Sequence, residues 1–372
     1  MPKLFEPSSL AGMTLENRFV RSATWEGLAT AAGTPTPELI RLMHTLALGG
    51  AGLLITGHAY ICREGRVRMT QLGADSDALI PELARLVAAV HAAGGCIALQ
   101  ISHGGIHSLT PERESHLPKD PRPAGASTIH LPSGPLGRPM DEGELADVVH
   151  RFALAAGRAR SAGFDAVQIH AAHGFLLSQF LSPFFNKRED GYGGTVGSRA
   201  RLLLEVLAAV RAAVGTDYPV LVKMNSEDFL PDGLGVSDMV ATAALLETGD
   251  IDALELSGGT RLSGEFTYSR TSRAGLGQSE AYYETAARAY KEQIETPLIL
   301  VGGIRTLQTA ERLVAQGITD YIALSRPLVR EPDLVARWRS GDVRPATCIS
   351  DNGCFIPARE GRGIACTAER RK

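Results

Sequence analysis

The sequence predicts an α/β protein that folds as a (β/α)8 TIM barrel. Short apolar segments alternate with longer segments in which apolar residues recur at helical spacing. Most of the short segments are nearly continuous hydrophobic runs, which is typical of parallel strands buried on both faces. Eight strand–helix units fit within residues 1–345, and eight such units are the number that closes a barrel.

The predicted elements follow one another regularly along the chain. A short hairpin is expected within residues 4–15. Eight strands follow at residues 19–22, 52–56, 97–101, 166–169, 220–224, 253–256, 298–301 and 321–324. Helices are expected at residues 37–48, 77–93, 141–161, 198–214, 237–247, 279–293 and 306–316, with a short helix after Pro332. Residues 346–372 form a separate tail that contains cysteines.

Two features qualify this arrangement. A doubly wound open sheet is the alternative fold, but it would place a G-x-G-x-x-G turn after its first strand, and none is present there. Residues 102–139 are rich in Pro, Gly and His and lack periodicity. Because a loop of this length in a compact domain is usually functional, we expect it to be a lid or substrate loop.

Composition restricts the partners of the protein. The 372 residues carry a formal net charge of −3, so nucleic acid is not expected as a partner. No apolar run is long enough for a signal peptide or a membrane span. The five cysteines are then expected to be reduced thiols in the cytoplasm.

The ends of the last two strands suggest an anion site. Gly302 and Gly303 follow one strand, and Ser325 and Arg326 follow the next. Glycines let backbone N–H groups approach an anion, and Arg can bind a phosphate through two hydrogen bonds. The alternative is a simple tight turn beside a surface cation.

Gln100 and Lys223 lie at the ends of apolar strands and are expected to face the barrel mouth. Gln can both donate to and accept from a heterocycle edge, and a partly buried Lys requires an anionic partner. A reduced flavin would be such a partner. A salt bridge to Glu227 or Asp228 would also satisfy the lysine.

His170 and His173 follow the fourth strand. Two imidazoles at the mouth of a barrel could bind and polarise a carbonyl oxygen. They could instead bind a metal, but the sequence offers no convincing third ligand and no H-E-x-x-H motif. We therefore predict oxygen anchors and no metal.

Taken together, these motifs resemble the Old Yellow Enzyme family of FMN-dependent oxidoreductases, also called NADH:flavin oxidoreductases or ene-reductases. The resemblance covers about residues 4–341. Its specific parts are NRFVRSAT (17–24), LQISHGG (99–105), IHAAHGFLLSQFLSP (169–183), NKREDGYGG (186–194), VKMNSEDF (222–229), VGGIR (301–305) and LSRPLVREPDL (324–334).

The resemblance implies FMN at the carboxyl ends of the strands, with NADH or NADPH as electron donor. Its implied FMN-binding residues are Ser22, Ala23, Thr24, Gly57, Gln100, Lys223, Gly302, Gly303, Ser325 and Arg326. His170 and His173 would bind the carbonyl oxygen of an activated alkene, which accepts hydride at Cβ. The implied activity is the reduction of enone-like C=C bonds.

The chain departs from the family pattern at three places. Phe175 stands where many members have the Tyr that protonates Cα, and Lys223 stands where many have Arg. Trp25 replaces a Thr or Cys that tunes the flavin, and it could line the substrate pocket with Phe175. The possible substitutes for the missing phenol are Tyr60, His103, His107 and Tyr268; we expect Tyr60 and Tyr268 to be substrate-binding residues.

The tail carries Cys348, Cys354 and Cys366. It resembles the iron–sulfur segment of the 2,4-dienoyl-CoA reductase branch, with Asp351 at the position of the second Cys. Three Cys with a carboxylate fit a [4Fe–4S] cluster poorly. We interpret the tail as a degenerate form of that segment and expect NAD(P)H to reduce FMN directly.

Three hypotheses remain after the sequence alone. The first is an FMN-dependent NAD(P)H oxidoreductase acting on activated C=C bonds. The second is a flavin enzyme of the same fold that dehydrogenates, isomerises or demethylates, because Phe175 cannot donate a proton. The third is a catalytically weak flavin- or ligand-binding protein. A small-molecule substrate and a homo-oligomer, dimer or tetramer, are expected.

Overall fold

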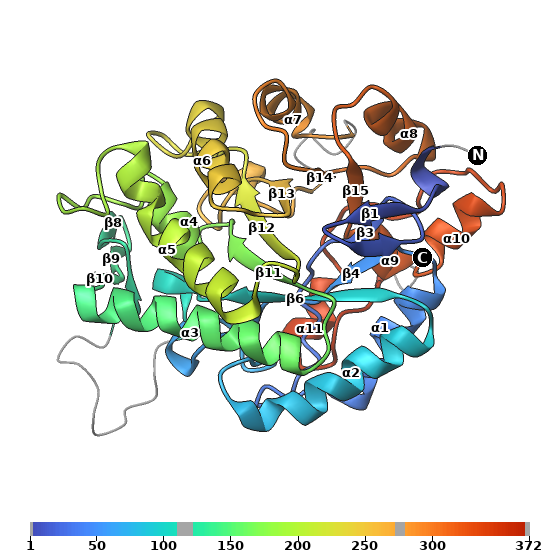
Figure 1. The fold of residues 1–372 in the computed structure, drawn as a ribbon, viewed down its shortest axis with the longest axis horizontal. Helices are drawn as coiled ribbons and strands as arrows, with labels where there is room; N and C mark the ends of the chain where they lie inside the picture. Colours follow the sequence, from blue (N-terminus) through green and yellow to red (C-terminus); the bar gives the residue numbers. More distant parts are fainter. Residues whose placement is uncertain (1–2, 110–121, 272–279, 369–372) are drawn as a thin grey trace.

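The computed structural model describes residues 3–109, 122–271 and 280–368. It confirms the predicted barrel (Figure 1), in which eight parallel strands pair in a closed ring. The ring closes because the last strand pairs with the first and the third pairs with the fourth. In chain order the strands are β3 (Phe19–Arg21), β4 (Leu53–Ile55), β6 (Cys96–Ser102), β11 (Ala166–Ala171), β12 (Val220–Asn225), β13 (Ala253–Ser257), β14 (Leu298–Val301) and β15 (Tyr321–Leu324).

Helices surround this ring in the expected order. They are α1 (Pro37–Leu48), α2 (Ile80–Ala92), α3 (Glu142–Ser161), α5 (Val196–Val214), α6 (Val236–Thr248), α7 (Glu284–Lys291), α8 (Leu307–Ala315) and α10 (Leu334–Arg339). Three short helices were not predicted: α4 (Leu176–Leu181), α9 (Arg326–Arg330) and α11 (Phe355–Arg359). Helix α7 begins later than predicted, and residue 279 lies outside the described residues.

The helix starts follow from local capping chemistry. Asp141 accepts a hydrogen bond from the Glu144 N–H, and the Glu144 side chain accepts from the Asp141 N–H, which forms a capping box before α3. Thr36, Thr195 and Thr306 cap α1, α5 and α8 through their hydroxyls. These caps position the helices against the outer face of the sheet.

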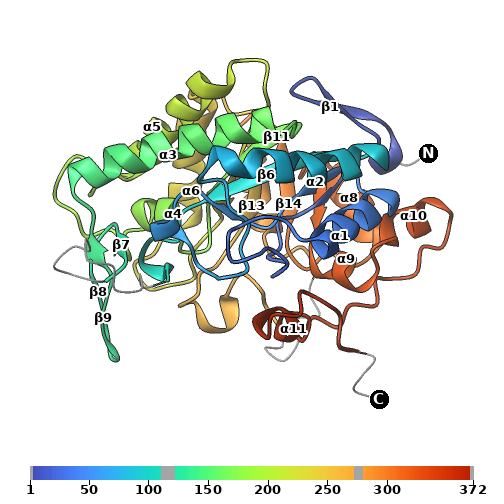
Figure 2. The same cartoon turned by 90° about the horizontal axis from the view of Figure 1, so that it is seen from below.

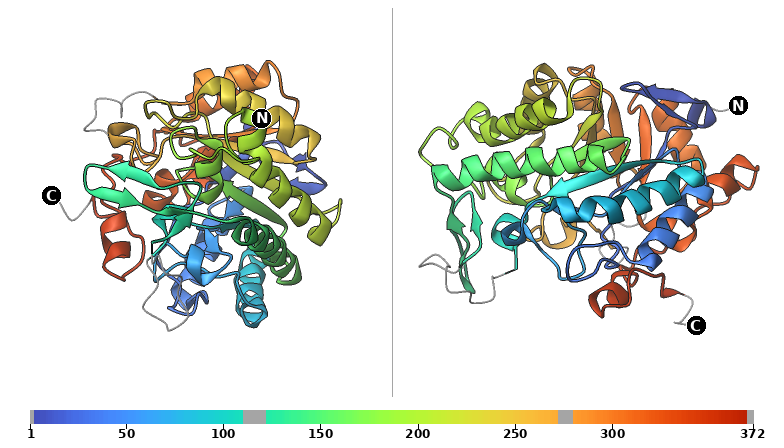
Figure 3. Two further views of the ribbon diagram at one scale, coloured as in Figure 1. Left: turned by 90° about the vertical axis from the view of Figure 1, so that its left-hand side faces the viewer. Right: turned by 60° about the horizontal axis from the view of Figure 1, so that its bottom comes forward.

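The N-terminal hairpin closes one end of the barrel. It consists of β1 (Ser8–Leu10) and β2 (Met13–Leu15), which pair antiparallel. Leu10, Met13 and Leu15 are buried in one apolar cluster with residues from inside the barrel, among them Leu53 and Ile299. Figure 3 shows the hairpin in dark blue and helix α11 in dark red on opposite sides of the molecule. Access to the barrel interior is therefore left at the carboxyl ends of the strands.

The long loop between β6 and α3, which was predicted to be a lid or substrate loop, contains four short strands in its described part. These are β7 (Ala124–Gly125), β8 (Ile129–Leu131), β9 (Gly134–Leu136) and β10 (Arg138–Pro139), and residues 110–121 of the predicted lid lie outside the described residues. The hairpin of β8 and β9 projects from the barrel (Figure 2). Strand β5 (Ala59–Tyr60) adds to β6 outside the ring.

The cysteine-containing tail is docked on the barrel. The Ala346 N–H donates to the Arg305 carbonyl over 2.7 Å, and the Ile364 N–H donates to the Glu26 carbonyl over 2.7 Å. Ala358 of α11 packs so closely on Gly27 that a Cβ there would lie 2.9 Å from the Ala358 Cβ. The tail thus forms part of the face that carries the strand ends. Within the described residues, no helix has the length and apolarity needed to cross a membrane.

Asn17 offers a test of how the first two barrel strands are joined. Its side chain donates to the Gly50 carbonyl over 2.8 Å and accepts from the Phe19 and Gly52 N–H groups over 2.9 and 3.2 Å. We expect Asn17→Ala to lower the free energy of unfolding by about 2 to 3 kcal/mol, because two buried backbone N–H groups and one partly buried carbonyl lose their partner. Urea unfolding measures this, with exposed Thr14→Ala as control. Equal midpoints for both variants would contradict it.

Candidate active site

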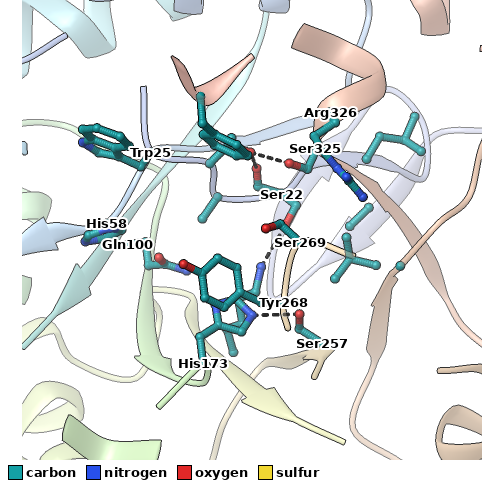
Figure 4. A pocket seen from close by; sticks show the side chains of 18 of the residues that line it. Ser22, Trp25, His58, Gln100, His173, Ser257, Tyr268, Ser269, Ser325 and Arg326 are labelled. Carbon is teal, nitrogen blue, oxygen red and sulfur yellow. Dashed lines mark hydrogen bonds between the residues drawn. The ribbon is translucent and has the colours of Figure 1, made fainter. Parts of the chain in front are cut away.

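A cavity opens at the carboxyl ends of the barrel strands (Figure 4). Residues from all eight barrel strands or the loops after them line it, together with residues of the tail. Fourteen of the sixteen predicted site residues contribute to this lining: Ser22, Ala23, Thr24, Trp25, Gln100, His170, His173, Phe175, Lys223, Tyr268, Gly302, Gly303, Ser325 and Arg326. The structure therefore brings together residues that are up to 304 positions apart in the sequence, from Ser22 to Arg326 (326 − 22).

Two predicted site residues do not line this cavity. Tyr60 is fully buried, and its hydroxyl donates to the Ala32 carbonyl over 3.2 Å, so the ring has a structural contact away from the site. The Gly57 N–H donates to the Glu26 carboxylate over 2.8 Å. A Cβ at Gly57 would also lie 2.8 Å from the Thr24 carbonyl oxygen, so the glycine permits close packing beneath the site.

Lys223 forms a buried ion pair with Glu255, which the sequence reasoning missed. The Lys223 Nζ donates to the Glu255 carboxylate and to the Ser22 hydroxyl, each over 2.8 Å. Strands β12 and β13 place the two residues directly opposite each other. The loop carboxylates considered as alternatives, Glu227 and Asp228, are not the partner. The signal was a single acidic residue within the apolar strand ALEL, at the register position of the lysine.

The same carboxylate orients Gln100 through a relay of amides. The Gln100 Nε2 donates to the Gln168 Oε1 over 2.7 Å, and the Gln168 Nε2 donates to Glu255 over 2.8 Å. Because Glu255 can only accept, both amide orientations are determined. The Gln100 carbonyl oxygen is then left for an N–H donor, and Lys223 has a third proton to donate. This pair of groups suits the edge of a heterocycle that carries adjacent N–H and C=O groups.

The glycine pair lies at the other side of the cavity. Gly302 and Gly303 have φ values of 134° and 73°, and a Cβ on Gly302 would lie 2.8 Å from the ring of Tyr283. Side chains at these positions would therefore be strained and would fill the space above the backbone. The Arg326 Nη1 donates to the Arg270 carbonyl and to the Asn352 Oδ1, each over 2.8 Å. Arg326 thus joins the predicted phosphate site to the tail.

The two predicted histidines lie side by side at the cavity, with ring centroids 5.2 Å apart. His173 adopts a left-handed backbone conformation, with φ of 65°, and its N–H donates to the Asn225 side chain over 3.0 Å. Its Nε2 lies 2.9 Å from the Ser257 hydroxyl (Figure 4). The His170 Nδ1 is buried and has no hydrogen-bond partner among the described residues. The site therefore contains an imidazole nitrogen that requires a ligand.

Both histidines are held in their neutral form. Burial holds the pKa of His170 and of His173 well below the ordinary value, and the Lys223 ammonium contributes to both shifts. A neutral imidazole can donate one hydrogen bond to an oxygen while its other nitrogen accepts. This state suits an oxygen anchor better than a proton donor.

His58 is a further histidine of the cavity that sequence reasoning did not single out. The Gln71 Oε1 accepts from the Val67 and Arg68 N–H groups, so its amide nitrogen faces His58 and donates to the Nδ1 over 2.8 Å. The His58 proton therefore resides on Nε2. Burial, with a smaller effect of the Arg68 charge, lowers the pKa of His58 to about 4. His58 thus supplies a neutral N–H donor beside Phe175, at 5.1 Å between ring centroids.

Phe175 forms an apolar wall, and Tyr268 is the phenol of the cavity that packs against the histidine pair. The Phe175 ring packs edge-on against His170 at 4.8 Å. The Tyr268 ring lies 4.9 Å from that of His173 and is drawn over it in Figure 4. Of the other candidate donors, neither His103 nor His107 lines the cavity. Tyr268 is therefore the candidate that the geometry retains.

Trp25 and Arg68 lie together at the cavity. The Arg68 guanidinium is 5.4 Å from the centroid of the indole ring. The Trp25 Nε1 is buried and has no hydrogen-bond partner among the described residues. Together with the His170 Nδ1, it is a polar atom that a bound molecule would satisfy, and the large apolar indole face suits a planar ring. These residues fit a flavin and a small substrate bound in one cavity.

The three tail cysteines lie close to this site. Cys348, Cys354 and Cys366 are free thiols and line a second, small cavity with Asp351. The Arg330 Nη1 lies 3.6 Å from the Cys366 Sγ, and burial raises the pKa of the Cys354 thiol to about 11. In the part of the chain that the structure describes, no three His, Cys, Asp or Glu side chains are arranged to hold a metal ion.

Comparisons with known proteins agree with a flavin-binding cavity. The family model described as "NADH:flavin oxidoreductase / NADH oxidase family" matches residues 3–343. The chain belongs to this family. Its solved structural relatives include the Old Yellow Enzyme homologue from Zymomonas mobilis, with a TM-score of 0.76 and 26% identity over 94% of this chain and 96% of that one. The resemblance inferred from the motifs is therefore confirmed.

Two curated relatives of this family differ in how much of them the chain covers. The 4,4'-dithiodibutanoate disulfide reductase of Rhodococcus erythropolis is 34% identical over 95% of this chain and 92% of that protein. The metal reductase of Desulforamulus reducens is 34% identical over 98% of this chain but only 53% of that protein. The chain thus spans about half the length of the latter. A 2-naphthoyl-CoA reductase, 24% identical with a TM-score of 0.90, shares the fold.

As a family member, the protein is an NAD(P)H-dependent flavin oxidoreductase with FMN as its cofactor. The residues described above fit this cofactor. Gln100 and Lys223 would contact the edge of the flavin ring, Ser22, Ala23 and Thr24 would lie along it, and Gly302, Gly303, Ser325 and Arg326 would hold the phosphate. Three observations support this fit. The His170 Nδ1 and the Trp25 Nε1 have no hydrogen-bond partner among the described residues, and the Gln100 amide is held in one orientation. Gly302 and Gly303 leave their backbone free of side chains.

The ion pair of Lys223 and Glu255 can be tested in the flavin-free protein. Glu255→Gln should lower the free energy of unfolding by about 3 kcal/mol or more, because it leaves a buried ammonium without its counter-charge. Adding Lys223→Met should recover part of this loss, because the unpaired charge is then removed. Denaturant unfolding of the two single variants and the double variant measures the coupling. Strict additivity of the two substitutions would contradict the pair.

The low pKa of His58 predicts a pH dependence of stability. Between pH 6.5 and about 4, the unfolded chain binds a proton at His58 that the folded protein does not bind. Stability is therefore lost as the pH falls through this window, by about 1.4 kcal/mol per pH unit for this residue. His58→Asn should reduce the slope by that amount, measured by urea unfolding at pH 6.5, 5.5 and 4.5. An unchanged slope would argue against the neutral buried imidazole.

Proposed function

We propose that this flavin oxidoreductase reduces C=C bonds conjugated to a carbonyl group. The observation that carries the proposal is the pair of neutral histidines beside the residues that fit the flavin. Bound FMN would supply the hydride, which it receives from NAD(P)H. The remaining steps depend on side chains of this protein.

His170 and His173 would hold the carbonyl oxygen of the substrate. Each is neutral, so each can donate one N–H to an oxygen on which negative charge develops as Cβ accepts hydride. The Asn225 side chain accepts from the backbone N–H of His173, and the Ser257 hydroxyl contacts the ring at Nε2, so the imidazole costs little to orient during the reaction. The histidines therefore act as a preorganised oxygen site.

Phe175 and Trp25 would form the apolar walls on either face of the alkene. Phe175 is almost fully buried between His58 and His170, and it cannot exchange a proton. Trp25 presents its indole under the Arg68 guanidinium. Such walls exclude water from the reacting carbon and hold the substrate flat.

Tyr268 would supply the proton to Cα. Tyr268 lines the cavity, and its ring lies beside His173, one of the two histidines that would hold the carbonyl oxygen. A phenol gives a proton more readily than a neutral imidazole such as His58, because a neutral imidazole is a far weaker acid. Tyr268, packed against His173, would thus replace the phenol that is missing at Phe175, which packs against His170.

A second candidate function is the reduction of a disulfide, favoured by Phe175. Hydride transfer to one sulfur cleaves the S–S bond and releases one thiol and one thiolate, so no carbon needs a proton. A site without the usual phenol would suffice for this reaction. The relative from Rhodococcus erythropolis carries the name of a 4,4'-dithiodibutanoate disulfide reductase.

One anaerobic experiment separates the two candidates. The enzyme-bound flavin is reduced with one equivalent of NADPH or NADH and then mixed with cyclohexenone or with 4,4'-dithiodibutanoate. Reoxidation, followed at 450 nm, is expected within seconds for cyclohexenone, with cyclohexanone as product. Turnover of the disulfide alone would support the second candidate. Reoxidation by neither compound would refute both candidates.

We also propose a cytoplasmic homo-oligomer, a dimer or a tetramer. The five thiols of the chain, all free in the structure, agree with a reducing compartment. Light scattering during size-exclusion chromatography measures the oligomeric state, and a monomer at micromolar concentration would contradict the proposal.

The role of Tyr268 can be tested by substitution. Tyr268→Phe should slow reoxidation by cyclohexenone by about 10²-fold, the usual contribution of a general acid, and leave reduction by NAD(P)H unchanged. Tyr282→Phe is the matched control, because Tyr282 also lines the cavity but lies against the glycine pair. Phe175→Tyr in the Tyr268→Phe background should restore part of the rate. Equal rates in Tyr268→Phe and wild type would exclude this residue as the donor.

A further inference from the structure

The cavity has an unusual balance of charge. Its described lining contains no aspartate or glutamate, but it contains six cationic side chains: Arg68, Lys223, Arg261, Arg305, Arg326 and Arg359. A concave surface with one sign of charge attracts ligands of the other sign. This positive charge exceeds what a flavin phosphate requires.

Three of the six are accounted for by groups already described. Lys223 is paired with Glu255. Arg326 is bonded to the Arg270 carbonyl and to Asn352, beside the glycine pair, and Arg305 follows that pair in the VGGIR motif. Arg305 and Arg326 thus belong to the end of the cavity that suits the cofactor phosphate.

The other three arginines of the lining, Arg68, Arg261 and Arg359, have no contact with the glycine pair or with Lys223 among the hydrogen bonds and ion pairs described above. Arg68 lies over Trp25, and its charge acts on His58, whose ring packs against Phe175. Arg68 is also coupled to Tyr268, which lies on His173. We refer to Arg68, Arg261 and Arg359 as the arginine trio.

The members of the trio come from three separate parts of the chain and repel one another. Arg68 lies in the segment after β5, Arg261 in the loop after β13 and Arg359 at the end of α11 in the tail. All three side chains line the same cavity, and burial together with the positive charges of Arg261 and Arg359 lowers the pKa of Arg68. In the described residues none of them forms an ion pair with a carboxylate.

We propose that the arginine trio is a binding subsite for a carboxylate carried by the substrate. Guanidinium groups bind carboxylates through paired, charge-assisted hydrogen bonds, and a bound anion would relieve the repulsion among the three cations. The subsite deepens the proposed function, because it rests on reduction in this cavity and adds that the reducible compound is an anion. Its reducible bond would lie at the histidine pair while its carboxylate meets the trio.

The phosphates of NAD(P)H offer similar chemistry, and kinetics can separate the two sources. The probes are cyclohex-2-enone bearing a carboxypropyl arm at C4 and the primary amide of the same compound. At low ionic strength wild type should prefer the carboxylate by at least about tenfold in kcat/KM. The preference should fall toward one in Arg261→Gln/Arg359→Gln, while the rate of flavin reduction by NAD(P)H stays the same.

A matched control is available in the same segment of the tail. Arg362 is exposed, pairs with Glu360 and does not line the cavity. Arg362→Gln removes one positive charge three residues from Arg359 and should retain the full preference. Arg261 and Arg359 are themselves exposed, so the double variant should fold and bind FMN. A loss of preference in Arg362→Gln as well would attribute the effect to overall charge and overturn the subsite.

The remaining outcomes distinguish this subsite from the proposed function. If wild type reduces both probes equally, the subsite is refuted and the ene-reductase proposal stands. If the double variant slows only flavin reduction by NAD(P)H, the trio binds the nucleotide and the substrate assignment is refuted. If neither probe is reduced, the proposed function fails, and binding to the oxidised enzyme still tests the subsite. The shift in flavin absorbance should then give a Kd at least about tenfold lower for the carboxylate than for the amide, and equal values would refute it.

Discussion

The buried ion pair between Lys223 and Glu255 is the interaction on which the active-site face depends. It joins two neighbouring barrel strands, holds the Ser22 hydroxyl and orients Gln100 through Gln168. Placing two charges inside an apolar barrel costs desolvation energy that their attraction repays only with good geometry. Here the carboxylate accepts from three side chains, so both of its oxygens are used. One carboxylate thereby presents an ammonium and an amide oxygen at defined positions to a bound ring.

Most of the fold and much of the site could be predicted from the sequence. Strands buried on both faces leave a clear apolar signature, and the carboxyl ends of parallel strands meet at one face, so His170, His173 and Lys223 could be placed together from their positions alone. The order of strands and strand-end residues along the chain was sufficient for this prediction. The same reasoning misplaced Tyr60, because nearness to a strand end does not determine which way a side chain in a short extra strand points.

The residues that escaped prediction depend on contacts between distant segments. Glu255 is recognisable only when β12 and β13 are set in register, and the proton position of His58 follows from Gln71, thirteen residues away. The docking of helix α11 on Gly27 depends on the absence of a side chain more than 300 residues earlier in the chain (358 − 27 = 331). Neither spacing nor composition contains these relations, since they arise only when the chain is folded.

The position of the tail has a consequence for how such an enzyme can diversify. The strands supply the groups that the chemistry requires, whereas the tail contributes Phe355 and Arg359 to the cavity from outside the barrel. It is attached through backbone hydrogen bonds to Arg305 and Glu26 and through Asn352. Because backbone contacts tolerate changes of side chain, mutations in this segment can alter what the cavity accepts while the barrel stays under constraint. Substrate range and reaction chemistry can then evolve on different parts of one polypeptide.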